Sequence, residues 1–388
     1  MRVFVVAAEA SGDAIAADFI RALRTRVPDV TISGVGGAAM AGEGVKTTVS
    51  IAGLSVLGLF EGLKVYGRVV RAADETAEAA RVFDPDVVVL VDSWGFMLRV
   101  ALRIRRVCPR ARIVKYIGPQ IWATRPGRAR ALARTVDHVI CLFAIETPAY
   151  AALDLPATVC GYPALGRFVA GDGAAFRARH GLGLQVPVIL VLPGSRPAEL
   201  HGVAPVLWRA GLALRTDFPE ARLVTVAASS VADTVRAQAP HEALIVTEDE
   251  KGDAFAAATV ALAASGTVTT ELALQGAPVI VGYRLGWFTW LVARFFLYKA
   301  RFISILNVIA DAEVMPEFMQ TRFTLENIVA AASPLLNDPD KRRAQINAQN
   351  EALRALGRGA RPASEIAVDV VIAEAARAGG QPRLPTAT

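Results

Sequence analysis

Residues 188–199 read VILVLPGSRPAE, in which five apolar residues are followed at once by Pro-Gly-Ser-Arg-Pro. A short apolar run that stops at Pro and Gly predicts a buried strand that ends in a tight turn. Gly194 lets backbone amides approach a ligand closely, and Ser195 and Arg196 add a hydroxyl and a fixed cation suited to phosphate oxygens. The Walker A pattern is absent. The stretch therefore indicates either another kind of anion-binding loop or an ordinary strand-to-helix turn.

The same strand-turn-helix pattern recurs along the chain. Apolar runs typical of strands lie at 2–8, 31–35, 86–91, 112–117, 137–142, 157–160, 187–192, 222–227, 243–247, 259–263 and 278–282. In the first half, helical patterns follow at 13–26, 61–82, 95–107, 125–134 and 145–153. Strands that alternate with helices predict parallel sheets with right-handed crossovers. The pattern lapses around 163–186, so we expect two sheets rather than one.

These observations predict an α/β protein with two Rossmann-like, doubly wound parallel-sheet domains that face a central cleft. Ligands of such sheets bind at the carboxyl ends of the strands. The expected boundaries are 1–163 for the first domain, 164–186 for a linker with one short helix, 187–375 for the second domain, whose last helices can cross back, and 376–388 for a disordered tail.

The composition narrows the class of protein. The chain has 388 residues, of which 53% are hydrophobic and 20% charged, which excludes a disordered protein. Its three cysteines show no metal-ligand spacing, and no uncharged apolar stretch is long enough to span a bilayer. Eleven Lys or Arg residues and no Asp or Glu lie between Ser93 and Val136. This block favours anionic partners, or else forms the solvated faces of helices, while the low aromatic content argues against nucleic acid.

A second loop has the features of an anion site. The stretch ALAASGTVTTELALQGAPVIVGYR (261–284) places Ser265, Gly266 and Thr267 between a strand and a helix. The amides at a helix N-terminus bind anions, and Glu271 can accept hydrogen bonds from a ribose diol or complement the helix dipole. Two such loops in one sheet suit a nucleotide diphosphate, for which a metal is not obligatory.

Eight segments, taken together and in order, resemble the lipid-A-disaccharide synthase family. They are AEASGD (8–13), GVGGAAM (34–40), PDVVVLVD (85–92), IGPQIWA (117–123), LPGSRPAE (192–199), ASGTVTTE (264–271), VGYR (281–284) and NVIADAEVMPEFMQ (307–320). The family consists of inverting, UDP-sugar-dependent glycosyltransferases of the GT-B type. The resemblance covers roughly residues 1 to 375.

The resemblance implies a specific reaction. Such enzymes transfer 2,3-diacylglucosamine from UDP to 2,3-diacylglucosamine 1-phosphate, which forms a β(1→6) bond and releases UDP during lipid A synthesis. It also implies no cofactor, no metal, and a cytoplasmic location on the inner face of the inner membrane among anionic lipids. A homodimer is one assembly that it allows.

The resemblance implies that residues of these matching motifs form the active site. Asp92 is the candidate general base, although it can instead cap the helix at 95–107. The expected donor residues are Gly194, Ser195, Arg196, Ser265, Gly266, Thr267, Glu271, Asn307, Glu317 and Gln320. The expected acceptor-side residues are Glu9, Ser11, Gly12, Asp13 and Trp122. Of the latter, Ser11 or Asp13 can also be a helix cap.

Four departures from the family pattern concern mostly the first domain. Gly95 replaces the second aspartate of D-x-P-D, Tyr162 replaces the histidine of G-H, and Thr124 ends the motif that closes with W-A-W in the family. The fourth is Ser304-Ile305-Leu306-Asn307 in place of S-L-P-N. We therefore hypothesise that donor binding is retained while acceptor choice or turnover has shifted.

Three alternatives stay open. The chain can be a GT-B relative with another acceptor or sugar, a catalytically silent nucleotide- or lipid-binding protein, or a UDP-sugar epimerase. The epimerase would need a histidine motif that is lacking. Two segments favour contact with lipid, or else core helices: IAGLSVLGLFEGLKVYG (51–67) and LGWFTWLVARFFLYKARF (285–302), the latter with Trp287 and Trp290.

Overall fold

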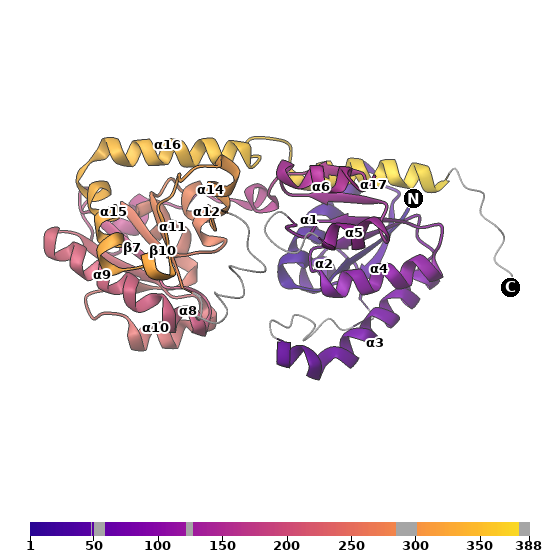
Figure 1. The fold of residues 1–388 in the computed structure, drawn as a ribbon, viewed down its shortest axis with the longest axis horizontal. Coiled ribbons are helices and arrows are strands. Elements are labelled where there is room, and N and C mark those ends of the chain that lie inside the picture. The colour runs from indigo at the N-terminus through magenta and orange to yellow at the C-terminus, as the bar shows by residue number, and fades with distance from the viewer. Residues whose placement is uncertain (48, 50–58, 122–126, 285–300, 380–388) are drawn as a thin grey trace. The chain divides into compact units, whose positions relative to one another are not determined.

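The computed structural model describes the chain except for residues 48, 50–58, 122–126, 285–300 and 380–388 (Figure 1). The contacts divide it into two compact units. Unit 1 comprises Met1–Gly166 and Ala360–Thr388, and unit 2 comprises Arg167–Gly359. Within the described part, no helix is both long and apolar enough to cross a membrane.

Unit 1 is built on a six-stranded parallel sheet in the order β2-β1-β3-β4-β5-β6. Its strands are β1 Arg2–Ala7, β2 Thr31–Val35, β3 Val87–Val91, β4 Arg112–Tyr116, β5 His138–Cys141 and β6 Ala157–Val159. The run VVVLV of β3 is buried along its whole length, as expected of a parallel strand covered on both faces.

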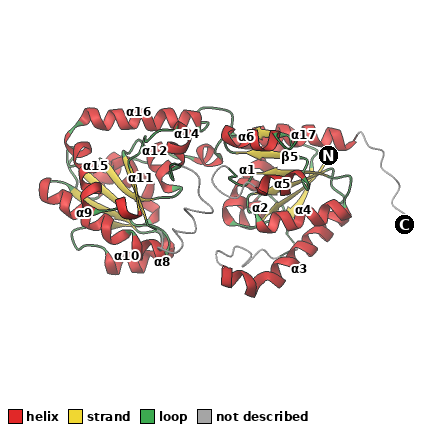
Figure 2. Ribbon diagram, viewed as in Figure 1, coloured by secondary structure: helices red, strands yellow, loops and turns green. Residues whose placement is uncertain are grey.

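Helices cover both faces of this sheet (Figure 2). They are α1 Ala10–Arg26, α2 Ala38–Gly42, α3 Leu59–Phe83, α4 Gly95–Val107, α5 Gly127–Ala133, α6 Thr147–Ala151 and α17 Ala363–Gly379, with short 3₁₀ turns η1 Ala144–Glu146 and η2 Pro163–Arg167. The core on one face joins α3, α4, α5 and α6 to the strands, and α1 and α17 pack together on the other.

The helix α17 lies near the C-terminal end of the chain but belongs to unit 1, where Figure 1 shows it in yellow among indigo and magenta elements. Its Glu374 accepts a hydrogen bond of 2.7 Å from Arg112 of β4 and contacts His138 of β5 at 3.2 Å. Residues 376–379, which are predicted to be part of a disordered tail, instead form the last turn of this helix. The rest of that predicted tail lies outside the described residues.

Unit 2 repeats the architecture, with strands in the order β12-β11-β10-β7-β8-β9. They are β7 Val188–Leu192, β8 Arg222–Val226, β9 Leu244–Val246, β10 Val260–Ala264, β11 Val279–Tyr283 and β12 Glu317–Met319. The strand β12 was not predicted, because its first residue, Glu317, is a buried acid that interrupts the apolar pattern. It pairs in parallel with β11.

The helices of unit 2 also lie on both faces of its sheet. They are α7 Gly173–Arg179, α8 Pro197–Gly202, α9 Ala204–Asp217, α10 Ala232–Gln238, α11 Lys251–Ala257, α12 Val268–Leu274, α14 Ile305–Ala310, α15 Leu325–Asn337 and α16 Pro339–Ala355, with 3₁₀ turns η3 Ser229–Val231, η4 Glu248–Glu250 and η6 Gln320–Arg322. The core on one face joins α8, α9, α10 and α15 to the strands.

Each sheet reverses its strand order at one point. In unit 1 the chain leaves β1 on one side to form β2 and returns to place β3 on the other side of β1. In unit 2 the corresponding reversal lies between β7 and β10. The loops that follow strands on the two sides of such a reversal diverge and leave a crevice, which is where open α/β sheets bind ligands. The fold thus predicts a site after β1 and β3, and another after β7 and β10.

Candidate functional site

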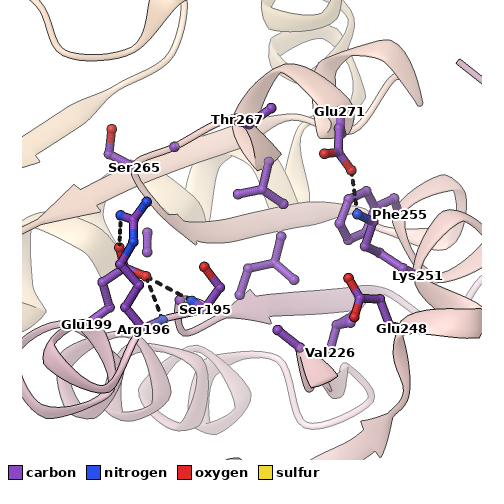
Figure 3. Close-up of a pocket in the computed structure, with 16 residues that line it drawn as sticks. Ser195, Arg196, Glu199, Val226, Glu248, Lys251, Phe255, Ser265, Thr267 and Glu271 are labelled. Carbon is purple, nitrogen blue, oxygen red and sulfur yellow. Dashed lines mark hydrogen bonds and ion pairs between the residues drawn. The ribbon is translucent and has the colours of Figure 1, made fainter. Parts of the chain in front are cut away.

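The loop after β7 is shaped around Glu199. Gly194 adopts φ +117°, and a Cβ at this position would lie 2.5 Å from the Cβ and Oε2 of Glu199. The Glu199 carboxylate accepts hydrogen bonds from the amides of Ser195 (2.8 Å) and Arg196 (3.3 Å), and it pairs with the Arg196 guanidinium at 3.0 Å (Figure 3). Only glycine fits here, and Glu199 holds the loop and its cation in place.

A pocket of about 280 Å³ lies at the reversal between β7 and β10. It is lined by Leu192, Gly194, Ser195, Arg196, Glu199, Val226, Ala228, Glu248, Lys251, Phe255, Ala264, Ser265, Gly266, Thr267, Val268 and Glu271. Both loops singled out in the sequence therefore meet at one site. Figure 3 shows Arg196 and Ser265 toward one side of the pocket and Glu271, Lys251 and Phe255 toward the other.

The Glu271 side of the pocket is charged. Lys251 pairs with Glu271 at 2.7 Å and lies over the Phe255 ring. Nearby, the side-chain and backbone hydrogen bonds from Ser229 lower the pKa of Glu248 below its ordinary value. The pocket thus offers a guanidinium on one side, and carboxylates with an ammonium on the other.

Most predicted donor residues line this pocket: Gly194, Ser195, Arg196, Ser265, Gly266, Thr267 and Glu271. The other three, Asn307, Glu317 and Gln320, are not among the lining residues, and each is buried. Asn307 exchanges two hydrogen bonds of 2.8 Å with the backbone of Met315 and donates to Glu317 at 3.1 Å.

The second buried side chain of this network, Glu317, also accepts hydrogen bonds from the amides of Ile303 (2.9 Å) and Ser304 (3.0 Å). The side chains of Asn307 and Glu317 are therefore satisfied by their own surroundings, and they brace the segment 303–307 against β12.

The reversal in unit 1 brings Asp92 together with the start of α1. The Ser11 hydroxyl donates a hydrogen bond of 3.3 Å to Oδ2 of Asp92. Asp92 and Ser93 adopt φ +51° and +36°, a left-handed turn that is uncommon for residues other than glycine, although Asp adopts it more readily than most. Asp92 does not cap α4, because the N-cap position is Trp94 and no side chain caps it.

Lys115 lies buried beneath this turn. Its ammonium donates hydrogen bonds to the carbonyls of Leu90 (3.3 Å), Tyr116 (3.3 Å) and Asp92. Burial lowers the pKa of Lys115 to about 7, against the opposing effects of Asp92 and Glu9. From the sequence, this lysine is predicted only to belong to the basic block. A lysine inside the apolar run RIVKY was the signal that could have singled it out.

The remaining acceptor-side predictions have different outcomes. The start of α1 also contains Gly12, where a Cβ would lie 3.4 Å from the Asp92 Cβ. Asp13 is 5% exposed, and its carboxylate accepts hydrogen bonds from the amides of Gly37 (2.7 Å), Ala39 (2.8 Å) and Met40 (3.2 Å). It therefore holds the start of α2, as the helix-cap alternative allowed.

Several predictions fall on residues without a described placement. These are Trp122, Thr124, Trp287 and Trp290, together with most of the two segments expected to contact lipid.

Part of the basic block is paired with acids. Arg103 pairs with Asp74, and Arg105 and Arg112 pair with Asp137 at 2.7 and 3.0 Å. Arg103 and Arg105 lie on α4 and are partly exposed, which supports the interpretation of the block as solvated helix faces, whereas Arg112 lies in β4.

Comparison with known proteins identifies sequence relatives along nearly the whole chain. A family model described as lipid-A-disaccharide synthetase matches residues 3–371. The lipid-A-disaccharide synthase of Rhodospirillum centenum is 36% identical over 376 residues, which cover 95% of this chain and 94% of that protein. That of Ruegeria pomeroyi is 37% identical over 390 residues, which cover 96% and 95%.

Solved structures with the same architecture are more distant in sequence. The UDP-GlcNAc 2-epimerase of Neisseria meningitidis, bound to UDP-GlcNAc, superposes with a TM-score of 0.60 at 14% identity, covering 96% of this chain and 100% of that one. A spinosyn rhamnosyltransferase superposes with a TM-score of 0.52 at 15% identity, covering 95% and 100%. At such identities these structures report the fold, which is the predicted GT-B architecture, whereas the sequence relatives report the family.

Proposed function

The chain belongs to the lipid-A-disaccharide synthase family, and from this premise we propose which of its residues carry the reaction. The protein is a glycosyltransferase that transfers 2,3-diacylglucosamine from its UDP derivative to 2,3-diacylglucosamine 1-phosphate. The products are the β(1→6)-linked lipid A disaccharide and UDP. The membership also favours this reaction over the UDP-sugar epimerase alternative, which shares only the fold.

The pocket between β7 and β10 is the proposed site for the UDP part of the donor. Arg196 and the loop Ser265–Thr267 would hold the diphosphate, and Glu271 would accept hydrogen bonds from the ribose hydroxyls. The observation that supports this most is the convergence of both predicted loops on one pocket, with the Arg196 guanidinium held in place by Glu199. A fixed cation at this position stabilises the negative charge that develops on the leaving UDP.

Asp92 is the proposed general base. In the reaction, the 6-hydroxyl oxygen of the acceptor attacks the anomeric carbon of the donor, and its proton passes to the Asp92 carboxylate. The bond between the anomeric carbon and the diphosphate oxygen breaks, and UDP leaves with the electron pair. Ser11 would orient the carboxylate through its hydrogen bond to Oδ2. The start of α1, with Glu9 and Gly12, and the predicted residue Trp122 would line the acceptor side.

The departures at Gly95, Tyr162 and Thr124 lie in the acceptor half of the chain. We propose that donor binding is retained and that the acceptor preference or the turnover rate has changed. The pattern of changes supports this, since the loops after β7 and β10 keep the family motifs and line a common pocket. Of the four departures, one, at residues 304–307, lies in unit 2.

The acylated substrates suggest where the protein works. We propose that it binds the cytoplasmic face of the inner membrane peripherally, through anionic lipids, and that it can act as a homodimer. Co-sedimentation with vesicles that contain an anionic phospholipid, compared with neutral vesicles, tests the first point. Analytical ultracentrifugation tests the second. Absence of binding to anionic vesicles would remove the membrane proposal.

The reaction itself is tested with purified protein, both substrates and mass spectrometry. We expect a tetraacyl disaccharide phosphate and an equal amount of UDP, and we expect Arg196→Ala to lower the rate by about 10²-fold. UDP binding without product would instead favour another acceptor or a silent binding protein. Product formation by Arg196→Ala at the normal rate would contradict the assigned role of that residue.

A further inference from the structure

The side chain of Lys115 is buried directly under the turn that carries Asp92. It is 2% exposed and reaches from β4 to the end of the neighbouring strand β3. A lysine ammonium is among the groups least often buried, because its desolvation is costly. The burial of this ammonium next to the turn of the proposed general base therefore has to be explained by the contacts that it makes.

The three acceptors around Lys115 match a protonated amine. Its Nζ donates to the carbonyls of Leu90, Asp92 and Tyr116, which are all backbone oxygens. An ammonium has three N–H donors, so each carbonyl receives one hydrogen bond. A neutral amine has two donors and one lone pair, and the lone pair would then face a carbonyl oxygen. All three hydrogen bonds can therefore form only when Lys115 is protonated, and one of them is lost when it is deprotonated.

The same contacts fix the backbone of Asp92 on both sides. Its carbonyl accepts from Lys115, and its amide donates to the Tyr116 carbonyl at 2.8 Å. Both partners belong to β4, so the left-handed turn at Asp92 and Ser93 is tied to the adjacent strand. A strained turn persists only where its surroundings determine it in this way.

We propose that Lys115 is a positioning residue for the reaction: its ammonium holds the turn that directs the Asp92 carboxylate toward Ser11 and the acceptor hydroxyl. This inference rests on the proposed role of Asp92 as general base. Lys115 itself touches no substrate and takes no proton from one. A displacement of about 1 Å in such a base is enough to cost roughly 10²-fold in rate.

The proposal has a consequence for pH dependence. The carboxylates that act on Lys115 are Asp92 after β3 and Glu9 after β1, and both favour its charged form. Burial acts in the opposite direction and is the larger effect, which brings the pKa of Lys115 to about 7. Loss of the proton above this pH removes one of the three donors, so the rate should fall on the alkaline side of neutrality.

The test uses Lys115→Met, which keeps the length of the side chain without its charge, in the full-length protein. The matched control is Ile113→Met, which places the same residue in the same strand and on the same face, two positions away. We expect Lys115→Met to lower kcat by about 10²-fold with the donor KM changed less than about threefold, and Ile113→Met to stay within about threefold of wild type. The alkaline decline of the wild-type rate should be present in Ile113→Met and lost in Lys115→Met.

Three results would overturn the proposal. The first is a wild-type kcat in Lys115→Met, and the second is an alkaline decline of the rate that this variant keeps. The third is that Lys115→Met no longer binds UDP or no longer melts cooperatively, which would indicate a merely structural role. The pH profile of the wild-type protein serves as a measurement that needs no variant to fold. If wild type makes no disaccharide, or if Asp92→Asn keeps the full rate, the proposed function or the assignment of the general base is wrong, whatever Lys115 does. A wild-type rate in Lys115→Met beside an inactive Asp92→Asn overturns only the inference about Lys115.

Discussion

The hydroxyl of Ser11 lies 3.3 Å from the carboxylate of Asp92, although 81 positions separate the two residues in the chain. They meet because β1 and β3 are neighbours in the sheet and both strands end at the reversal of strand order. This contact joins the start of α1 to the proposed general base.

Removal of the Ser11 hydroxyl should slow catalysis without weakening donor binding. A hydrogen bond to a charged group contributes about 1.5–3 kcal/mol, so Ser11→Ala should lower kcat by roughly tenfold or more while the Kd of UDP stays unchanged. Thr25→Ala is the matched control, because Thr25 lies on the same helix and its hydroxyl bonds only to the Arg21 carbonyl at 3.0 Å among the contacts described. Equal rate losses in both variants would contradict a specific role for Ser11.

Gly194→Ala should damage the loop after β7. The added methyl would meet Glu199 at 2.5 Å, and φ +117° is unfavourable for alanine. We expect a loss of about 1–3 kcal/mol in the free energy of unfolding, together with weaker UDP binding by calorimetry. Gly127→Ala is the control and should be neutral, because among the described residues no atom beyond its own helix and chain neighbours lies within 4 Å of the new methyl. Normal UDP affinity in Gly194→Ala would argue against this loop as a diphosphate site.

Glu271 has two proposed partners, a ribose diol or the dipole of α12, and a thermodynamic cycle separates them. UDP and 2′,3′-dideoxy-UDP are titrated into wild type and Glu271→Ala. If the carboxylate binds the diol, wild type should prefer UDP by roughly tenfold and the variant should show little preference. An equal preference in both proteins would leave Glu271 as a helix-dipole residue paired with Lys251.

Acid should loosen the attachment of α17. Burial acts to raise the pKa of Glu374, but the hydrogen bonds from His138 and Arg112 prevail and lower it to about 2. A depressed pKa means that the stabilisation is complete above the ordinary value near 4.5 and is lost as the pH falls from there toward 2. The melting temperature should therefore decrease across this range in wild type, and less steeply in Glu374→Gln. Parallel pH profiles of the two proteins would contradict this assignment.

The sheets were predictable because buried parallel strands are continuous apolar runs. The runs that became β3 and β7 are five residues long and buried throughout. The strand β12 escaped prediction because Glu317, its first residue, is a buried acid. The start of α1 was placed three residues late, at 13 instead of Ala10. The stretch Ser-Gly-Asp reads as a helix cap in sequence, but Asp13 holds α2 instead.

The site was predictable where a loop directly follows a strand. Arg196 and Ser265 lie just after β7 and β10, so their meeting follows from the parallel sheet. Asn307 and Glu317 lie in one motif, but the sequence does not show that their side chains bond to each other instead of facing the donor. Lys115 was missed for a similar reason, since its role comes from the carbonyls of a neighbouring strand.

The measurement that tests the central claim most directly is the rate of disaccharide formation by Asp92→Asn. The variant is compared with wild type on UDP-2,3-diacylglucosamine and 2,3-diacylglucosamine 1-phosphate, with UDP binding measured in parallel. Asparagine keeps the shape of the side chain but accepts no proton, so we predict a loss of about 10²- to 10⁴-fold in kcat with normal UDP affinity. A rate equal to that of wild type would show that another group takes the proton, and the assignment of Asp92 would be wrong.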